Sequence, residues 1–207
     1  RHLGIGADGL ILVSPKNAEG SLADFRIFNA DGSEAEISGN GLRCAAAVRF
    51  AAGPAAGTKI VFRTVTGYRP CALIAVEGRA ARIRVEMGAP HLASKDIPFD
   101  DGTPRERIVD YPLWIHGKTY PVTVLSMGNP HCGLFFDAFP TRNEGLAIAR
   151  EIEVHPFFPN RTNVEFIRVL SRGEIEVRFW ERGVGETMAS GSGSSAAAVA
   201  AILKGLT

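Results

Sequence analysis

Two short segments of the chain combine serine and glycine in an order that could do chemistry. Ser38–Ala46 has the sequence SGNGLRCAA and Ser190–Ala198 has SGSGSSAAA, and the two superimpose at one constant offset. A glycine-rich turn that enters a helix presents unpaired backbone N–H groups at the positive end of the helix dipole, and together these hold an anion. Ser38 and Ser190 stand first in their turns, where that field would act on a nucleophile or a proton-transfer group.

A plainer explanation of both serines is that they are helix N-caps, a role for which serine is strongly preferred. Spacing alone favours this explanation. The match also includes Glu34 and Glu186 and the strand-like segments around them, which indicates an internal repeat rather than a chance match in an alanine-rich chain. In the chemical interpretation, each half supplies one serine, and the two serines face each other across a cleft between domains.

Four polar segments adjoin strand-like runs and carry amides, carboxylates or basic side chains. They are Asn29–Glu36, Met127–Gly133, Asn160–Asn163 and Trp180–Thr187. Each alone is more often simply a turn. Beside two anion-holding helix starts they suit an amino acid as ligand, because its ammonium group needs acceptors and its carboxylate needs N–H donors.

Other familiar sites are not supported by their context. Gly4–Gly9 matches G-x-G-x-x-G, but an apolar strand rather than a helix follows it, so we expect a turn and not a dinucleotide site. Neither repeated serine lies in G-x-S-x-G, and no lysine follows a glycine-rich run as in nucleotide hydrolases. The five histidines show no metal-ligand spacing, so no metal is implied.

Strands must position most of these groups, because apolar and polar residues partly alternate through much of the chain. Small-residue or amphipathic patterns predict only three helices, over Gly41–Phe50, Asn143–Ile152 and Ser194–Leu203. The most polar, turn-rich stretch between the two repeats is Phe99–Arg107. We therefore divide the chain into domains of residues 1–104 and 105–207.

Composition limits the class of protein. The chain has 207 residues, of which 45% are hydrophobic, and 23 Lys and Arg balance 22 Asp and Glu to a net charge of +1. Such a charge gives no broad field for nucleic acid or anionic lipid, so neither is an expected partner. The longest apolar run, Ala196–Leu203, is far short of the about 18 residues that cross a bilayer. Three cysteines without C-x-x-C spacing favour a reducing, cytoplasmic setting.

Five longer segments carry a family resemblance. They are RHLGIGADGLILV, FRIFNADGSEAEISGNGLRC, SMGNPHCGLFF, HPFFPNRTNVEF and ERGVGETMASGSGSSAAAVAAI. In this order, over nearly the whole chain, they resemble the diaminopimelate epimerase family. The resemblance implies an α/β (α+β) fold of two pseudo-symmetric domains, each a mostly antiparallel, β-barrel-like sheet around a central helix, with the active site between them.

The resemblance also implies an activity and its residues. The family interconverts LL- and meso-diaminopimelate for lysine and cell-wall precursor synthesis, without pyridoxal phosphate or metal, by transferring the α-proton between two bases. Ser38 and Ser190 occupy the two catalytic positions, and His131 and Glu181 flank them. The substrate-binding residues implied are Asn29, Gly39, Asn40, Asn129, Asn163, Glu181, Arg182, Gly191 and Ser192.

The chain departs from the family at those two catalytic positions, where relatives carry cysteine. A thiol has a free pKa of about 8.5, which a helix start can lower, whereas a serine hydroxyl is a much weaker acid and needs an adjacent base. The only candidates are His131 and Glu181. Cys44 lies in the first predicted helix, and we expect it to pack in the core rather than replace a base.

Several explanations of the serines stay open. The chain is a natural serine variant with some epimerisation, a double cysteine-to-serine variant made to trap the inactive enzyme, or a relative adapted to another amino acid or to elimination. The rival classes are therefore a catalytically silent amino-acid-binding protein and a lyase. The chain begins at Arg1 and lacks the family's first strand, with its substrate-binding asparagine, and its last strands, so we expect a fragment. Whether it forms a homodimer is left open.

Overall fold

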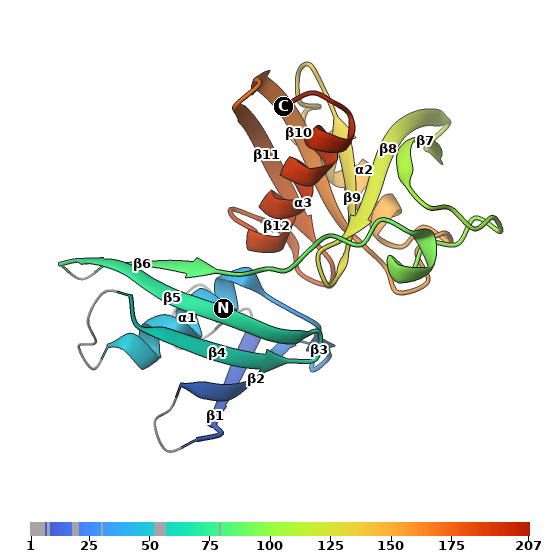
Figure 1. Ribbon diagram of the computed structural model, residues 1–207. Helices are drawn as coiled ribbons and strands as arrows, with labels where there is room; N and C mark the ends of the chain where they lie inside the picture. The colour runs from blue at the N-terminus through green and yellow to red at the C-terminus, as the bar shows by residue number, and fades with distance from the viewer. Residues whose placement is uncertain (1–6, 8, 18–20, 30, 52–56, 79) are drawn as a thin grey trace. The chain divides into compact units, whose positions relative to one another are not determined.

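A computed structural model describes residues 7, 9–17, 21–29, 31–51, 57–78 and 80–207 (Figure 1). The contacts between residues divide the chain into two compact units, Arg1–Gly88 and Ala89–Thr207. The expected turn at Gly4–Gly9 lies largely outside the described residues.

The polar stretch Phe99–Arg107, at which we divide the sequence, belongs to the second unit. Phe99 is buried in that unit's core, and the backbone N–H of Ser94 donates to the carbonyl of Arg105 over 2.8 Å. His91 also pairs with Ser126 in an isolated β-bridge. The chain therefore joins the second unit as soon as it leaves Gly88, because apolar side chains within the polar stretch are buried there.

The first unit is a six-stranded sheet with one helix against it. Its elements are β1 (Gly9–Pro15), β2 (Leu22–Asn29), β3 (Glu34–Ala35), α1 (Gly39–Phe50), β4 (Lys59–Thr64), β5 (Gly67–Glu77) and β6 (Ala80–Val85). The strand order is β1-β2-β4-β5-β6, with β3 paired to β2. Only the β2–β4 pair among these described strands is parallel. Helix α1 packs on the sheet, and its Leu42 shares a buried core with Phe25 and Phe62.

The second unit repeats this plan with one more helix. A short 3-10 turn (Ser94–Asp96) precedes β7 (Ile108–Ile115), β8 (Lys118–Ser126), β9 (Pro130–Phe135), α2 (Arg142–Glu153), β10 (Asn163–Ser171), β11 (Glu174–Glu181), β12 (Gly185–Thr187) and α3 (Gly191–Leu203). The strand order is β12-β11-β10-β9-β8-β7. Its one parallel pair among the described strands, β9–β10, lies at the centre of the sheet.

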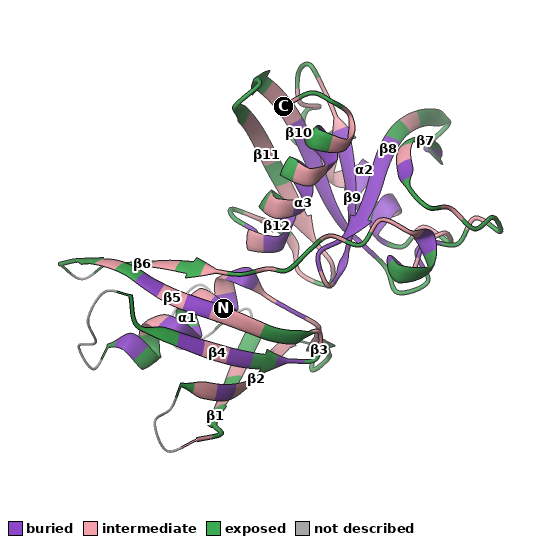
Figure 2. Cartoon of the chain, viewed as in Figure 1, coloured by how far each residue is buried: buried purple, intermediate pink, exposed green. Residues whose placement is uncertain are grey.

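Both faces of this central pair are covered. The first five residues of β9 and of β10 are all buried (Figure 2), whereas a strand with one wet face would alternate. Ile148 and Ile152 of α2 share a core with Phe166 on one face. On the other face α3 comes so close that a Cβ added to Gly133 would lie 3.6 Å from the Cβ of Ala200.

These elements confirm the α+β fold of two similar, mostly antiparallel units, each with a helix entered through the repeated turn. The three predicted helices are confirmed, and each begins one to three residues before its predicted start, at Gly39, Arg142 and Gly191, because the turn residues are already helical. The expectation for Cys44 is wrong. Cys44 is exposed, since α1 buries Leu42 and Ala45 on its opposite side. No helix in the described part of the chain is long and apolar enough to span a bilayer.

Candidate active site

The two repeated serines have the same local structure. Ser38 has extended backbone angles (φ −141°, ψ 114°), and its Oγ accepts a hydrogen bond of 3.0 Å from the N–H of Gly41. Ser190 has φ −134° and ψ 125°, and its Oγ accepts from the N–H of Gly193 over 3.2 Å. Both serines are N-caps, as the plainer explanation predicts. Each hydroxyl oxygen also lies at the positive end of its helix. The repeat found in the amino-acid sequence is therefore also a repeat of local structure.

The residues after each serine form the first helical turn. Gly39 begins α1 and Gly191 begins α3. In α1 the Oδ1 of Asn40 accepts a hydrogen bond from the guanidinium group of Arg43. In α3 Ser192 is buried, and Ser190 itself is 7% exposed. Since a helix start leaves backbone N–H groups without intrahelical partners, both turns are suited to hold a carboxylate.

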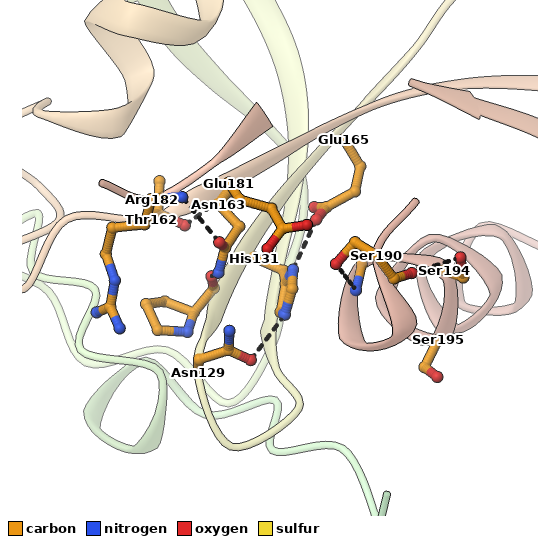
Figure 3. Close-up of polar contacts among 12 residues, drawn as sticks. Asn129, His131, Thr162, Asn163, Glu165, Glu181, Arg182, Ser190, Ser194 and Ser195 are labelled. Carbon is orange, nitrogen blue, oxygen red and sulfur yellow. Dashed lines mark hydrogen bonds and ion pairs between the residues drawn. The ribbon is translucent and has the colours of Figure 1, made fainter. Parts of the chain in front are cut away.

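A buried histidine–glutamate pair lies beside Ser190 (Figure 3). The Nδ1 of His131 and the Oε1 of Glu165 are 2.6 Å apart, and the side chains are 1% and 2% exposed. The other ring nitrogen, Nε2, lies 2.9 Å from the Oδ1 of Asn129. Parallel pairing brings the pair together, because Glu165 lies opposite Gly133, two residues along β9 from His131 on the same face.

Glu165 is a site residue that we do not predict from the sequence. Its Oε2 is buried and has no hydrogen-bond partner among the residues that the structure describes. Burial raises the pKa of the Glu165 carboxyl group, the adjacent His131 lowers it in part, and the charge of Glu181 raises it further. A titratable group perturbed by burial and by specific neighbours is typical of a functional site. The available signal is a single carboxylate within the apolar start of a strand, VEFI.

Asn163 joins two segments that carry other candidate residues. Its Oδ1 accepts a hydrogen bond of 3.0 Å from the backbone N–H of Arg182, and its Nδ2 donates to the carbonyl of Pro130 over 2.8 Å. The guanidinium group of Arg182 donates to the carbonyl of Asn160 over 2.8 Å. Asn163 therefore fixes the start of β9 relative to the turn after β11, a positioning role that leaves one amide hydrogen for a ligand.

A second buried carboxylate supports the same turn. Glu153, 5% exposed, accepts hydrogen bonds from the indole N–H of Trp180 over 2.6 Å and from the N–H of Gly183 over 2.9 Å. It also pairs with Arg161. Glu181 lies within the segment held in this way, and its Oε1 accepts from the hydroxyl of Thr187 over 2.8 Å.

The second unit thus brings together Asn129, His131, Asn163, Glu181, Arg182 and Ser190 with the helix start at Gly191 and Ser192. The remaining candidates, Asn29, Ser38, Gly39 and Asn40, lie in the first unit. Asn29 ends β2, where its Nδ2 donates to the Oγ of Ser33 over 3.0 Å. Across the described residues, no three His, Cys, Asp or Glu side chains are grouped as metal ligands.

The sequence is similar to proteins named diaminopimelate epimerase. A family model with that description matches residues 1–93 and 123–207. The Moorella thermoacetica enzyme is 48% identical over 206 residues, covering 99% of this chain and 72% of its relative. The Pelotomaculum thermopropionicum enzyme is 46% identical over 211 residues, covering 100% and 72%.

The fold is similar to solved structures of lower sequence identity. A hydroxyproline epimerase from Agrobacterium vitis, with bound trans-4-hydroxy-L-proline, aligns with a TM-score of 0.69 at 14% identity, over 96% of this chain and 60% of that one. A probable proline racemase from Agrobacterium radiobacter gives a TM-score of 0.65 at 17% identity, over 96% and 61%. At such identities these structures support the fold alone.

Proposed function

Because the chain belongs to the diaminopimelate epimerase family, we propose that it interconverts LL- and meso-2,6-diaminopimelate, with Ser38 and Ser190 in its two proton-transfer positions. The protein is accordingly an isomerase. The structural observation that carries the proposal is the repetition of a serine-capped helix start in both units. In this family the product serves lysine and cell-wall precursor synthesis.

The proposed reaction replaces the hydrogen of the α-carbon and inverts that carbon. A base at one position removes the hydrogen from the α-carbon, and an acid at the other position delivers a proton to the opposite face. Negative charge then builds on the substrate carboxylate. The N–H groups at the starts of α1 and α3 stabilise such charge, because they point out of the positive ends of their helices.

The remaining polar groups are assigned to substrate binding. Ammonium groups of the substrate require acceptors, which the carboxylate of Glu181 and the amide oxygens of Asn29 and Asn129 supply. Its carboxylates require donors, which Arg182 and the helix-start residues supply. His131 and Glu181 flank the proton-transfer position at Ser190, where the hydroxyl needs a base to act.

A silent amino-acid-binding protein is the second candidate. The observation in its favour is that both serine hydroxyls accept N-cap hydrogen bonds, a role that needs no proton transfer. A lyase that removes a β-substituent after losing the α-proton is the third class. All three candidates bind an amino acid. They differ in the product: an epimerase forms the other stereoisomer, a lyase forms a keto acid, and a binding protein forms no product.

We also propose that the reaction needs no pyridoxal phosphate and takes place in the reducing cytoplasm. Cofactor independence follows the family resemblance. The cytoplasmic setting is supported by the three cysteines, which are all free thiols. Dialysis against a carbonyl-trapping reagent should leave the activity unchanged, since such reagents remove pyridoxal phosphate.

The direct test incubates the protein with LL-diaminopimelate and separates the stereoisomers by chiral chromatography. Formation of the meso isomer supports the proposal. Saturable binding by calorimetry without any meso isomer supports the binding protein instead. A keto acid, detected with a hydrazine reagent, would identify a lyase. Asp137→Asn, at an exposed position that is not among the candidate residues, serves as a control that should keep the native rate.

A further inference from the structure

Glu165 is a buried acid that the proposed reaction does not use. It lies on β10, on the face covered by α3, and only its Oε1 is engaged, with the Nδ1 of His131 at 2.6 Å. Burying a carboxylate costs free energy unless hydrogen bonds and charge compensate it. A fully buried carboxylate with one unpaired oxygen therefore destabilises the fold more than an apolar side chain of similar size would. This cost points to a role for Glu165 at the imidazole ring of His131.

The hydrogen-bonding partners of His131 determine where the ring carries its proton. An ionised carboxylate only accepts hydrogen bonds, so Nδ1 must carry a hydrogen when it faces ionised Glu165. The remaining nitrogen, Nε2, faces the side-chain amide of Asn129 at 2.9 Å. An amide offers an oxygen to a protonated Nε2 and, after rotation, an NH₂ group to an unprotonated one. Asn129 can thus form a hydrogen bond with Nε2 whether or not that nitrogen is protonated. Ionised Glu165 can form one only with a protonated Nδ1.

The groups around Glu165 come from three elements. His131 bonds it from β9, Glu181 acts on it from β11, and Gly193 lies against it in the first turn of α3. A Cβ built on Gly193 would lie 2.9 Å from Oε1 and 3.1 Å from the Cβ of Ser190. The carboxylate is thereby held against the helix start that Ser190 caps.

We infer that Glu165 is the positioning residue of this site: it holds a hydrogen on Nδ1 of His131 and fixes the plane of the ring, which leaves Nε2 as the nitrogen that exchanges protons. The inference rests on the proposed function, in which His131 assists the proton transfer at Ser190. A buried carboxylate that orients an imidazole in this way acts through the ring and does not itself touch the substrate.

The test is ¹⁵N NMR of the histidine rings, which reports the protonation of each nitrogen directly. His131→Gln identifies the signals of His131 among those of the five histidines. At pH 7.5 we expect Nδ1 to be protonated in the native chain. In Glu165→Leu the acceptor is gone, so the proton should move to Nε2, where Asn129 accepts it. Glu165→Gln keeps an oxygen of the same reach and should retain Nδ1–H at least in part.

Two outcomes would overturn the inference: an unprotonated Nδ1 in the native chain, or unchanged ring signals in Glu165→Leu. Glu176→Leu, which removes a half-exposed glutamate on β11, is the matched control and should leave the His131 signals in place. In kinetics, Glu165→Leu should lower kcat by about 10- to 100-fold, as is typical for loss of a supporting hydrogen bond, and change KM far less. The ring signals need no turnover, so they decide the inference even if the native chain proves inactive and the proposed function fails.

Discussion

Gly193 and Glu165 are in such close contact that a side chain at position 193 would meet the carboxylate. A Cβ built there would lie 2.9 Å from the Oε1 of Glu165 and 2.9 Å from the ring of Phe179. The glycine is therefore required by the close approach of α3 to the sheet. This contact links the helix start at Ser190 to the carboxylate that bonds His131.

Gly193→Ala should accordingly destabilise the protein and displace Glu165 from His131. We expect the free energy of unfolding to fall by about 1–3 kcal/mol, the usual cost of overpacking, in urea denaturation. Gly173→Ala is the control, because nothing lies within 4 Å of the Cβ that it adds. Equal stability of the two variants would show that the close contact at Gly193 is absent.

Glu153 should matter for stability because it holds two segments of the site. Glu153→Ala leaves the indole N–H of Trp180 and the backbone N–H of Gly183 without their acceptor. We expect a loss of about 2–3 kcal/mol in the free energy of unfolding. Removing the half-exposed Glu176, which pairs with Arg168, should cost less than about 1 kcal/mol. A larger loss in Glu176→Ala than in Glu153→Ala would contradict the assignment.

Stability should depend on pH through Glu165. Burial raises the pKa of its carboxyl group above 4.5 in the folded state, against the opposing effect of His131. A group that binds its proton more tightly when folded contributes stability below its unfolded pKa and loses it as the pH rises through the folded pKa. The stability of Glu165→Gln relative to the native chain should therefore increase as the pH rises from about 4.5. Urea denaturation across pH 4–8 checks the sign, and a falling difference would be evidence against the burial of Glu165.

The three cysteines should differ sharply in reactivity. Cys44 is exposed on α1, whereas burial raises the pKa of Cys71 to about 12 and that of Cys132 well above its ordinary value. Since the thiolate is the reactive form, iodoacetamide at pH 8 should label Cys44 alone in the folded chain. Peptide mass spectrometry after brief treatment measures this, with labelling in urea as the reference. Rapid modification of Cys132 would mean that the core of the second unit is open.

The parts of this fold that depend on local sequence are those that the sequence predicts. The repeated turn predicts both helix starts, because the N-capping serine and the glycines and small residues after it act on the backbone of the next few residues. The place of Phe99 in the second core was not predictable, since its neighbours are polar and its contacts are distant in sequence.

Glu165 shows where prediction of the site ends. The sequence around Glu165 shows only a partly alternating pattern of apolar and polar residues, which predicts a strand. No local feature of the sequence indicates that β10 pairs in parallel with β9 so that Asn163 lies opposite His131. That register depends on contacts more than thirty residues apart in the chain. The sequence therefore indicates the two repeated serines but not the buried carboxylate that bonds His131.

The most direct test of the central claim is exchange of the α-hydrogen of LL-diaminopimelate in deuterated water, followed by NMR or mass spectrometry. It compares the native chain with the Ser38→Cys, Ser190→Cys double variant and with Ser195→Cys, a serine of α3 outside the two positions. Because a thiol at a helix start ionises far more readily than a hydroxyl, we predict faster exchange in the double variant than in the native chain and no gain in Ser195→Cys. Absence of exchange in both the native chain and the double variant would contradict the claim that Ser38 and Ser190 occupy the proton-transfer positions of an epimerase.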